Sequence, residues 1–229
     1  MKTIGLLGGM SWESTTSYYR AINEGVKNTL GGLHSAKIVM YSVDFEPLEE
    51  LQNTGDWKGI AIILSEAARN IESAGADFLV ICTNTMHKVA PEIEKSIKIP
   101  LLHIADATAE ALVHEGMKTV GLLGTAFTME QDFYKSRLSE NYGLHVLVPN
   151  EEDRQIIHRI IYQELVLGKI EGDSKTNYLR IIDMLANQGA EAVILGCTEI
   201  GLLITQDDTK VKLFDTTTIH AEKAMEYAT

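Results

Sequence analysis

Cysteine is scarce in this chain of 229 residues: only two are present, too few for a disulfide framework. Basic residues are also in the minority, with 20 Lys and Arg against 32 Asp and Glu and a formal net charge of −12. Binding to nucleic acid or to an anionic membrane needs a basic surface, so we expect neither partner. No apolar run approaches the roughly 18 residues of a membrane span, and the N-terminal run is too short for a signal peptide. The composition therefore predicts a cytoplasmic protein.

The chain repeats itself once. Residues 2–8 read KTIGLLG and residues 118–124 read KTVGLLG, which match at six of seven positions with an offset of 116. Farther on, residues 74–81 (AGADFLVI) resemble residues 188–195 (QGAEAVIL), with an offset of 114. One such match could be a chance likeness of two strand entries, but two matches in the same order indicate a duplication.

Short apolar runs alternate with helical patterns along both copies. The runs predict strands buried on both faces, at Ile4–Leu7, Lys37–Tyr41, Phe78–Ile81, Leu101–Ile104, Val120–Leu123, His145–Val148, Ala192–Leu195 and Lys212–Phe214. Helices are predicted at Asp56–Ser73, Met86–Ser96, Asp106–His114, Met129–Leu138, Glu151–Val166, Ser174–Asn187 and Thr217–Tyr227.

This alternation predicts an α/β fold of two similar halves, each a mostly parallel sheet flanked by helices, related by a pseudo-twofold axis. We expect the halves to be residues 1–100 and 101–214, with a final helix at 215–229 that returns to the first half. Ligands of open parallel sheets bind beyond the carboxyl ends of the strands, so we expect the active site in the cleft between the halves.

The two cysteines do not occupy equivalent places in the repeat. Residues 81–88 read ICTNTMHK and residues 194–201 read ILGCTEIG. With the offset of 114, Cys197 is equivalent to Thr83, whereas Cys82 is equivalent to Gly196. A cysteine acts as a base or nucleophile only as the thiolate, and a helix N-terminus lowers a thiol pKa. We therefore predict that Cys197 is the reactive thiol and that Cys82 is a buried strand-end residue.

Other candidate groups leave alternatives open. His87 follows Thr83 by four residues and could face the site, or it could be a solvated helical histidine. The glycines of residues 5–9 do not have the spacing of a dinucleotide-binding or phosphate-binding loop. They either let a small anion approach the backbone N–H groups or make a tight strand-to-helix turn. No Cys or His spacing indicates a metal site.

Three motifs together resemble the aspartate/glutamate racemase family, and more narrowly its broad-specificity or aspartate-type branch. They are GLLGGMS at residues 5–11, TNTMH at 83–87 and GCTE at 196–199, and the resemblance extends over the chain to FDT at 214–216. It implies a cofactor-independent enzyme that moves the α-proton of an amino acid between two cysteines on opposite faces of the substrate. It also implies a homodimer.

The resemblance assigns roles to individual residues. Cys197 is expected to be one acid/base, and Thr83 stands where the family has its other cysteine. The residues expected to bind or line the substrate are Met10, Ser11, Gln52, Asn84, Thr85, Thr125, Thr198 and Glu199. Of these, Glu199 could instead hold its own turn. Gln52 and Lys169 are candidates for contacting a side-chain carboxylate of the substrate.

The threonine at position 83 has a chemical consequence. A hydroxyl is about as weakly acidic as water, with a pKa of about 15.7 against about 8.5 for a thiol, so Thr83 cannot be an unaided base. We expect a racemase of a small amino acid, aspartate or glutamate first, that is biased to one enantiomer. The alternatives are a related enzyme (maleate isomerase, decarboxylase or hydantoin racemase type) or an amino-acid-binding protein with weakened catalysis.

Overall fold

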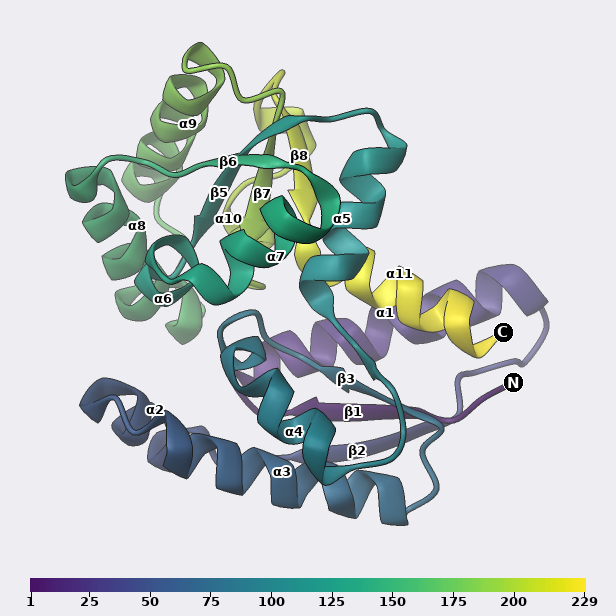
Figure 1. Ribbon diagram of the computed structural model, residues 1–229. Helices are drawn as coiled ribbons and strands as arrows, with labels where there is room; N and C mark the ends of the chain where they lie inside the picture. The colour runs from purple at the N-terminus through teal and green to yellow at the C-terminus, as the bar shows by residue number, and fades with distance from the viewer. The chain divides into compact units, whose positions relative to one another are not determined.

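The computed structural model describes all 229 residues, and they form two α/β units (Figure 1). Unit 1 consists of residues 1–104 and 220–229, and unit 2 of residues 105–219. The chain passes from unit 1 to unit 2 at Ile104 and returns at His220.

Unit 1 contains a parallel four-stranded sheet in the order β2-β1-β3-β4. Its strands are β1 (Ile4–Gly8), β2 (Ile38–Ser42), β3 (Phe78–Ile81) and β4 (Leu101–Leu102). Its helices are α1 (Trp12–Leu30), α2 (Phe45–Thr54), α3 (Trp57–Ser73), the 3-10 helix η1 (Thr85–Val89), α4 (Ala90–Ser96) and α11 (Thr216–Ala228) from His220 onward.

Unit 2 repeats this order with the sheet β6-β5-β7-β8, again parallel throughout. Its strands are β5 (Thr119–Gly124), β6 (His145–Leu147), β7 (Ala192–Gly196) and β8 (Lys212–Asp215). Its helical segments are α5 (Ile104–His114), α6 (Ala126–Glu130), α7 (Asp132–Tyr142), α8 (Glu151–Gln163), η2 (Leu165–Leu167), α9 (Gly172–Asn187), α10 (Ile200–Leu203) and η3 (Gln206–Asp208). The predicted fold class is thus confirmed.

Alternate residues of the central strands of unit 1 enter two different cores. Leu7 and Ile81 pack with residues of α2, α3 and α4, whereas Leu6 and Val80 pack with residues of α1 and α11. Because successive strand side chains point to opposite faces, helices on both sides leave these strands buried throughout.

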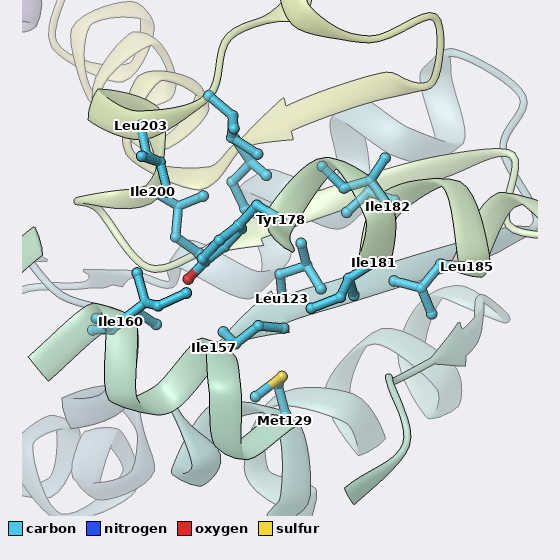
Figure 2. Close-up of a cluster of buried hydrophobic side chains, with 14 of the residues drawn as sticks. Leu123, Met129, Ile157, Ile160, Tyr178, Ile181, Ile182, Leu185, Ile200 and Leu203 are labelled. Carbon is cyan, nitrogen blue, oxygen red and sulfur yellow. The ribbon is translucent and has the colours of Figure 1, made fainter. Parts of the chain in front are cut away.

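Unit 2 has a corresponding core over α8, α9 and α10. Figure 2 shows Leu123 of β5 next to Ile157 of α8 and Ile181 of α9, all three fully buried. Cys197 packs against this cluster. The carboxyl end of β7, which carries Cys197, is therefore held by a dense apolar core.

The strand register supports the alignment of the two cysteine-bearing turns. Leu7 lies opposite Ile81 between β1 and β3, and Leu123 lies opposite Leu195 between β5 and β7. Counting on from these equivalent pairs places Cys82 with Gly196 and Thr83 with Cys197. The backbone pairing thus leads to the same equivalence as the sequence repeat.

Several predicted elements were wrong or were missed. The predicted strand Leu101–Ile104 ends at Leu102, since Ile104 already begins α5. The strand β2 is an edge strand with its last three residues exposed, so it is not buried on both faces. The sequence analysis missed α1 and α2. The helix α1 has a low share of apolar residues, but Tyr18, Ile22 and Val26 are spaced by four and form its buried stripe.

The longer predicted helices are interrupted. The segment Met86–Ser96 is divided between η1 and α4, and Met129–Leu138 between α6 and α7. None of the helices has both the length and the apolar character needed to cross a membrane.

Candidate active site

The turn after β1 carries Met10 and Ser11, which are both buried. A Cβ atom at Gly8 would lie 2.4 Å from Cγ2 of Thr15, so only glycine fits where the first turn of α1 approaches the strand. The N–H of Gly9 donates to Oγ1 of Thr15 at 2.8 Å. This donor is already used inside the protein, so the structure favours the tight-turn interpretation of the glycines over the anion site.

Ser11 is the N-cap of α1, and its side chain accepts a hydrogen bond from the N–H of Ser14 at 3.4 Å. The peptide bond between Met10 and Ser11 is cis. The hydroxyl of Ser14 donates to the carbonyl of Cys82 at 3.0 Å, and this bond joins the turn after β1 to the turn after β3.

The turn after β3 contains Thr83, which is half-buried, followed by the buried Asn84 and Thr85. His87 is also buried, and Nδ1 of its ring lies 2.8 Å from the carbonyl oxygen of Thr83. His87 is therefore not a solvated helical histidine but a hydrogen-bonding partner of this turn. Met10, Ser11, Thr83, Asn84 and Thr85 all lie at the carboxyl ends of the neighbouring strands β1 and β3.

The turn after β7 combines a thiol, a hydroxyl and a carboxylate. Cys197 and Thr198 are half-buried, and Glu199 is buried with 5% of its surface exposed. The thiol of Cys197 donates to Oε2 of Glu199 at 3.0 Å, and the hydroxyl of Thr198 donates to the same oxygen at 2.7 Å. Glu199 thus holds its own turn, as one of the two interpretations of the sequence had it.

The electrostatic environment of Cys197 differs from the expectation. Desolvation of the sulfur raises the Cys197 thiol pKa well above its ordinary value, and the negative charge of Glu199 raises it further. Backbone N–H groups of Thr198 and Glu199 act in the opposite direction but are outweighed. The predicted lowering of the pKa was wrong for the protein without substrate, because sequence spacing does not reveal desolvation or a neighbouring carboxylate.

Cys82 has the character of a core residue. It is fully buried, and its thiol points back to the carbonyl of Val80 at 4.0 Å. Burial alone raises the pKa of the Cys82 thiol far above its ordinary value. A thiol that neither ionises nor meets solvent is chemically inert.

Thr125 lies at the carboxyl end of β5, beside the turn that carries Cys197. It is buried and caps α6, accepting from the N–H of Thr128 at 3.4 Å. A Cβ atom at Gly124 would lie 2.8 Å from the carbonyl oxygen of Gly196, so glycine allows the two strand ends to approach. Thr125, Cys197, Thr198 and Glu199 are thus neighbours at one edge of the unit 2 sheet.

The two candidates for contacting a substrate side chain lie in different settings. Gln52 is buried on α2, the helix that follows β2. Lys169 is exposed in the segment after η2. No group of three or more His, Cys, Asp or Glu side chains in the protein is arranged to hold a metal ion.

Two residues near Cys197 were missed by sequence reasoning. Tyr178 of α9 is fully buried in the core that packs against Cys197, and its hydroxyl has no hydrogen-bond partner. Asp215 approaches Gly201 so closely that a Cβ atom there would lie 2.6 Å from its Oδ2. Tyr178 belongs to no recognisable motif, and Asp215 lies in the FDT segment without having been given a role; both come close to the turn only through folding.

Comparison with known proteins adds independent information. The family model described as Asp/Glu/Hydantoin racemase matches residues 7–224. The broad specificity amino-acid racemase RacX of Bacillus subtilis is 23% identical, over 97% of this chain and 96% of the relative.

Two crystal structures are similar over the whole chain. A protein of Yersinia pestis provisionally described as an Asp/Glu racemase is 55% identical with a TM-score of 0.94, covering 100% of this chain and 99% of the other. An aspartate racemase homologue of Pyrococcus horikoshii is 38% identical with a TM-score of 0.86 and the same coverage.

Proposed function

Since the chain belongs to the Asp/Glu/hydantoin racemase family and is an amino-acid racemase, an isomerase, we propose that it racemises a small amino acid without a cofactor by moving the α-proton. In this proposal Cys197 is the acid/base on one face of the substrate. Thr83 takes the place of a second cysteine on the other face. The observation that carries the proposal is the equivalence of Thr83 and Cys197 in two matching sheets.

The first step needs the Cys197 thiolate. The thiol of Cys197 donates a hydrogen bond to Glu199, whose charge keeps the thiol pKa high, so the thiol proton must pass to solvent before the thiolate can act. A substrate α-ammonium group near the sulfur would favour the anion, because an opposite charge stabilises a thiolate. The thiolate then takes the α-proton, and the electron pair left on Cα is delocalised into the substrate carboxylate.

The second step decides the stereochemical outcome. If Cys197 returns the proton, the α-hydrogen exchanges with solvent while the configuration is retained. If Thr83, or a water molecule that it binds, protonates the opposite face, the configuration is inverted. The hydroxyl must then recover a proton from solvent, and its low acidity makes inversion the slower outcome. The enzyme is thereby biased to the enantiomer whose α-proton faces Cys197.

The proposed substrates are aspartate and glutamate. Ser11, Asn84 and Thr85 in unit 1, and Thr125 and Thr198 in unit 2, offer small polar groups suited to a carboxylate and an amine, and Met10 would line the same site. Gln52 or Lys169 would contact the side-chain carboxylate. The names of two relatives, an Asp/Glu racemase and an aspartate racemase homologue, support this choice.

The test is solvent deuterium exchange. The protein is incubated in deuterated water with a panel of L- and D-amino acids, and the loss of the Cα proton signal is followed by NMR. Exchange of aspartate or glutamate ahead of leucine and phenylalanine supports the proposal. Exchange of none of them identifies a binding protein, and fastest exchange of leucine or phenylalanine contradicts the choice of substrate.

We further propose that the protein is a homodimer that uses an exposed apolar face of unit 1. This face is formed by Trp12, Tyr19 and Met40, which are 66%, 50% and 42% exposed. Met40 belongs to the edge strand β2, and a hollow beside it is lined by these three residues. A clustered apolar surface of this kind is typical of protein interfaces. Analytical ultracentrifugation tests this. A native protein of dimer mass beside a Trp12→Glu variant of monomer mass would support the proposed interface, and a native protein of monomer mass would contradict it.

A cytoplasmic location completes the proposal. Both cysteines are free, and the proposed chemistry needs Cys197 as a reduced thiol. A reducing compartment preserves that state. Cell fractionation followed by immunoblotting would test the location.

A further inference from the structure

Unit 1 contains a cluster of buried polar side chains that the proposed reaction does not use. It consists of His87, His103, His220 and Tyr18, and each of them is at most 4% exposed. The ring centroid of His87 lies 4.4 Å from that of His103 and 5.8 Å from that of His220. Histidine side chains packed this closely in a core need a specific reason, because an unsatisfied buried ring nitrogen is costly.

The partners of His87 determine which nitrogen of its ring carries the proton. The N–H of Ile104 points to Nε2 at 3.2 Å, so Nε2 must be the acceptor. The proton therefore lies on Nδ1, which donates to the carbonyl of Thr83 at 2.8 Å. One imidazole thus connects the Thr83 turn to Ile104, the last residue of unit 1 before the chain enters unit 2.

His220 has the opposite tautomer. The carbonyl of Leu102 lies 2.8 Å from Nε2, so Nε2 carries the proton and donates. Nδ1 then accepts from the hydroxyl of Tyr18 at 2.8 Å. His220 is the first residue of unit 1 after the chain returns from unit 2. The two histidines therefore bind the backbone at the two ends of the segment 102–104, which leads out of unit 1.

The equivalent place in unit 2 is built differently. With the offset of 114, His87 corresponds to Gly201. Val80 lies opposite Leu102 and Ile194 opposite Phe214, so His103 corresponds to Asp215. Gly201 lies against Asp215, and as a glycine it has no side chain that could bind the backbone of the Cys197 turn. The imidazole link is thus a property of the turn that carries threonine, and the turn that carries Cys197 lacks it.

We propose that His87 is a positioning residue for Thr83, holding the carbonyl of its turn against the segment that leads out of unit 1. The inference rests on the proposed function, in which Thr83 protonates the second face of the substrate. A threonine that acts as a weak proton donor needs accurate placement more than a thiol does. A misplacement of about 1 Å can cost about 100-fold in rate. Loss of the link should therefore reduce inversion and leave exchange at Cys197 unaffected.

Two substitutions separate the two bonds of His87. In His87→Asn the amide nitrogen lies near the position of Nδ1 and can still donate to Thr83, while the bond from Ile104 is lost. In His87→Gln the amide oxygen lies near the position of Nε2 and can still accept from Ile104, while the bond to Thr83 is lost. The measurement is the ratio of inversion to Cα deuterium exchange for the preferred enantiomer. We expect this ratio to fall about 10-fold or more in His87→Gln and to stay near the native value in His87→Asn.

Three outcomes overturn the proposal: native ratios in both folded variants, a fall in His87→Asn alone, or equal falls of exchange and inversion. The last outcome would indicate a structural role only. If the native protein exchanges no amino acid, the proposed function fails and the local geometry is tested separately. Nitrogen-15 NMR of histidine-labelled native protein should then show the His87 proton on Nδ1, and a proton on Nε2 contradicts the inference.

Discussion

The turns after β3 and β7 occupy the same place in two matching sheets, but different groups hold them. In unit 1, the ring of His87 donates a hydrogen bond to the backbone carbonyl of Thr83. In unit 2, Glu199 accepts a hydrogen bond from the thiol of Cys197 itself. One turn is held through its backbone and the other through its reactive group.

The comparison distinguishes where residues 83 and 197 lie from how readily each can give up a proton. Equivalent strand ends place residues 83 and 197 at equivalent positions of the two sheets. Only Cys197 has a pKa that a nearby charge can tune, since a threonine hydroxyl does not ionise in water near neutral pH. The two halves are thus alike in geometry and unequal in chemistry.

Removing the thiol should have the largest effect. Cys197→Ser replaces the base with a hydroxyl whose pKa is about 7 units higher, so we expect Cα exchange to fall about 1,000-fold or more. The matched control is Cys82→Ala, which changes the other cysteine in the core and should keep most of the native rate. Exchange is measured by NMR in deuterated water, with circular dichroism to show that both variants fold. An active Cys197→Ser beside an inactive Cys82→Ala would contradict the register.

Making the two turns chemically equal should have the next largest effect. Thr83→Cys restores a thiol at the equivalent position with little change in size. We expect the reaction of the disfavoured enantiomer to rise about 100-fold, in the range typical of a positioned acid/base group. The equilibrium constant between enantiomers stays at one, so only rates change. Cα deuterium exchange, followed by NMR from each enantiomer separately, measures this, and Thr83→Val, whose side chain has no proton donor, is the control. Comparable exchange of both enantiomers in the native protein, with no gain in Thr83→Cys, would exclude the one-base mechanism.

His220 should make the stability of unit 1 sensitive to acid. Burial lowers the pKa of His220 to about 4, whereas the unfolded chain has a histidine pKa of about 6.5. The unfolded state therefore binds the proton first, so stability is full above about pH 6.5 and is lost as the pH falls towards 4. We expect a loss of about 3 kcal/mol from this group.

Urea unfolding between pH 7 and 4 measures this loss. The control is the double variant Tyr18→Phe, His220→Gln. Glutamine does not titrate and keeps an N–H donor for the carbonyl of Leu102, but it lacks the Nδ1 acceptor, so Tyr18→Phe removes the hydroxyl that donated to it. Carboxylates that titrate in the same range contribute equally to both proteins. A pH slope as steep in the double variant as in the native protein would show that His220 is not the group responsible.

The smallest predicted effect concerns Glu199. Its charge and its hydrogen bond both raise the pKa of Cys197, so Glu199→Gln should lower that pKa. The rate of alkylation of Cys197 by iodoacetamide against pH reports the thiolate directly, and Cys82→Ala as the background removes the other thiol. Glu164→Gln, a change of another carboxylate of unit 2, is the matched control. An upward shift in Glu199→Gln would show that the carboxylate activates the thiol instead of restraining it.

Features that depend on local pattern and on repetition could be predicted without the structure. Apolar runs and their alternation with helices predicted two parallel α/β halves, and the offset of 114 made Thr83 the equivalent of Cys197 in the repeat. Such features survive in a linear sequence because strand burial, turns and duplicated segments involve residues close together or copied in order. Where the pattern was weak, as in the polar helix α1, the prediction failed.

The hydrogen-bond partners and the burial of the two turns depend on contacts between distant parts of the chain. The bond between His87 and Ile104 joins residues 17 apart, and that between His220 and Leu102 joins residues 118 apart, so no spacing rule could reveal either. The raised pKa of Cys197 likewise arises from desolvation by the core and from the direction in which the Glu199 carboxylate points. Burial and the orientation of charges exist only once distant segments have packed together, and here they raise the pKa of Cys197.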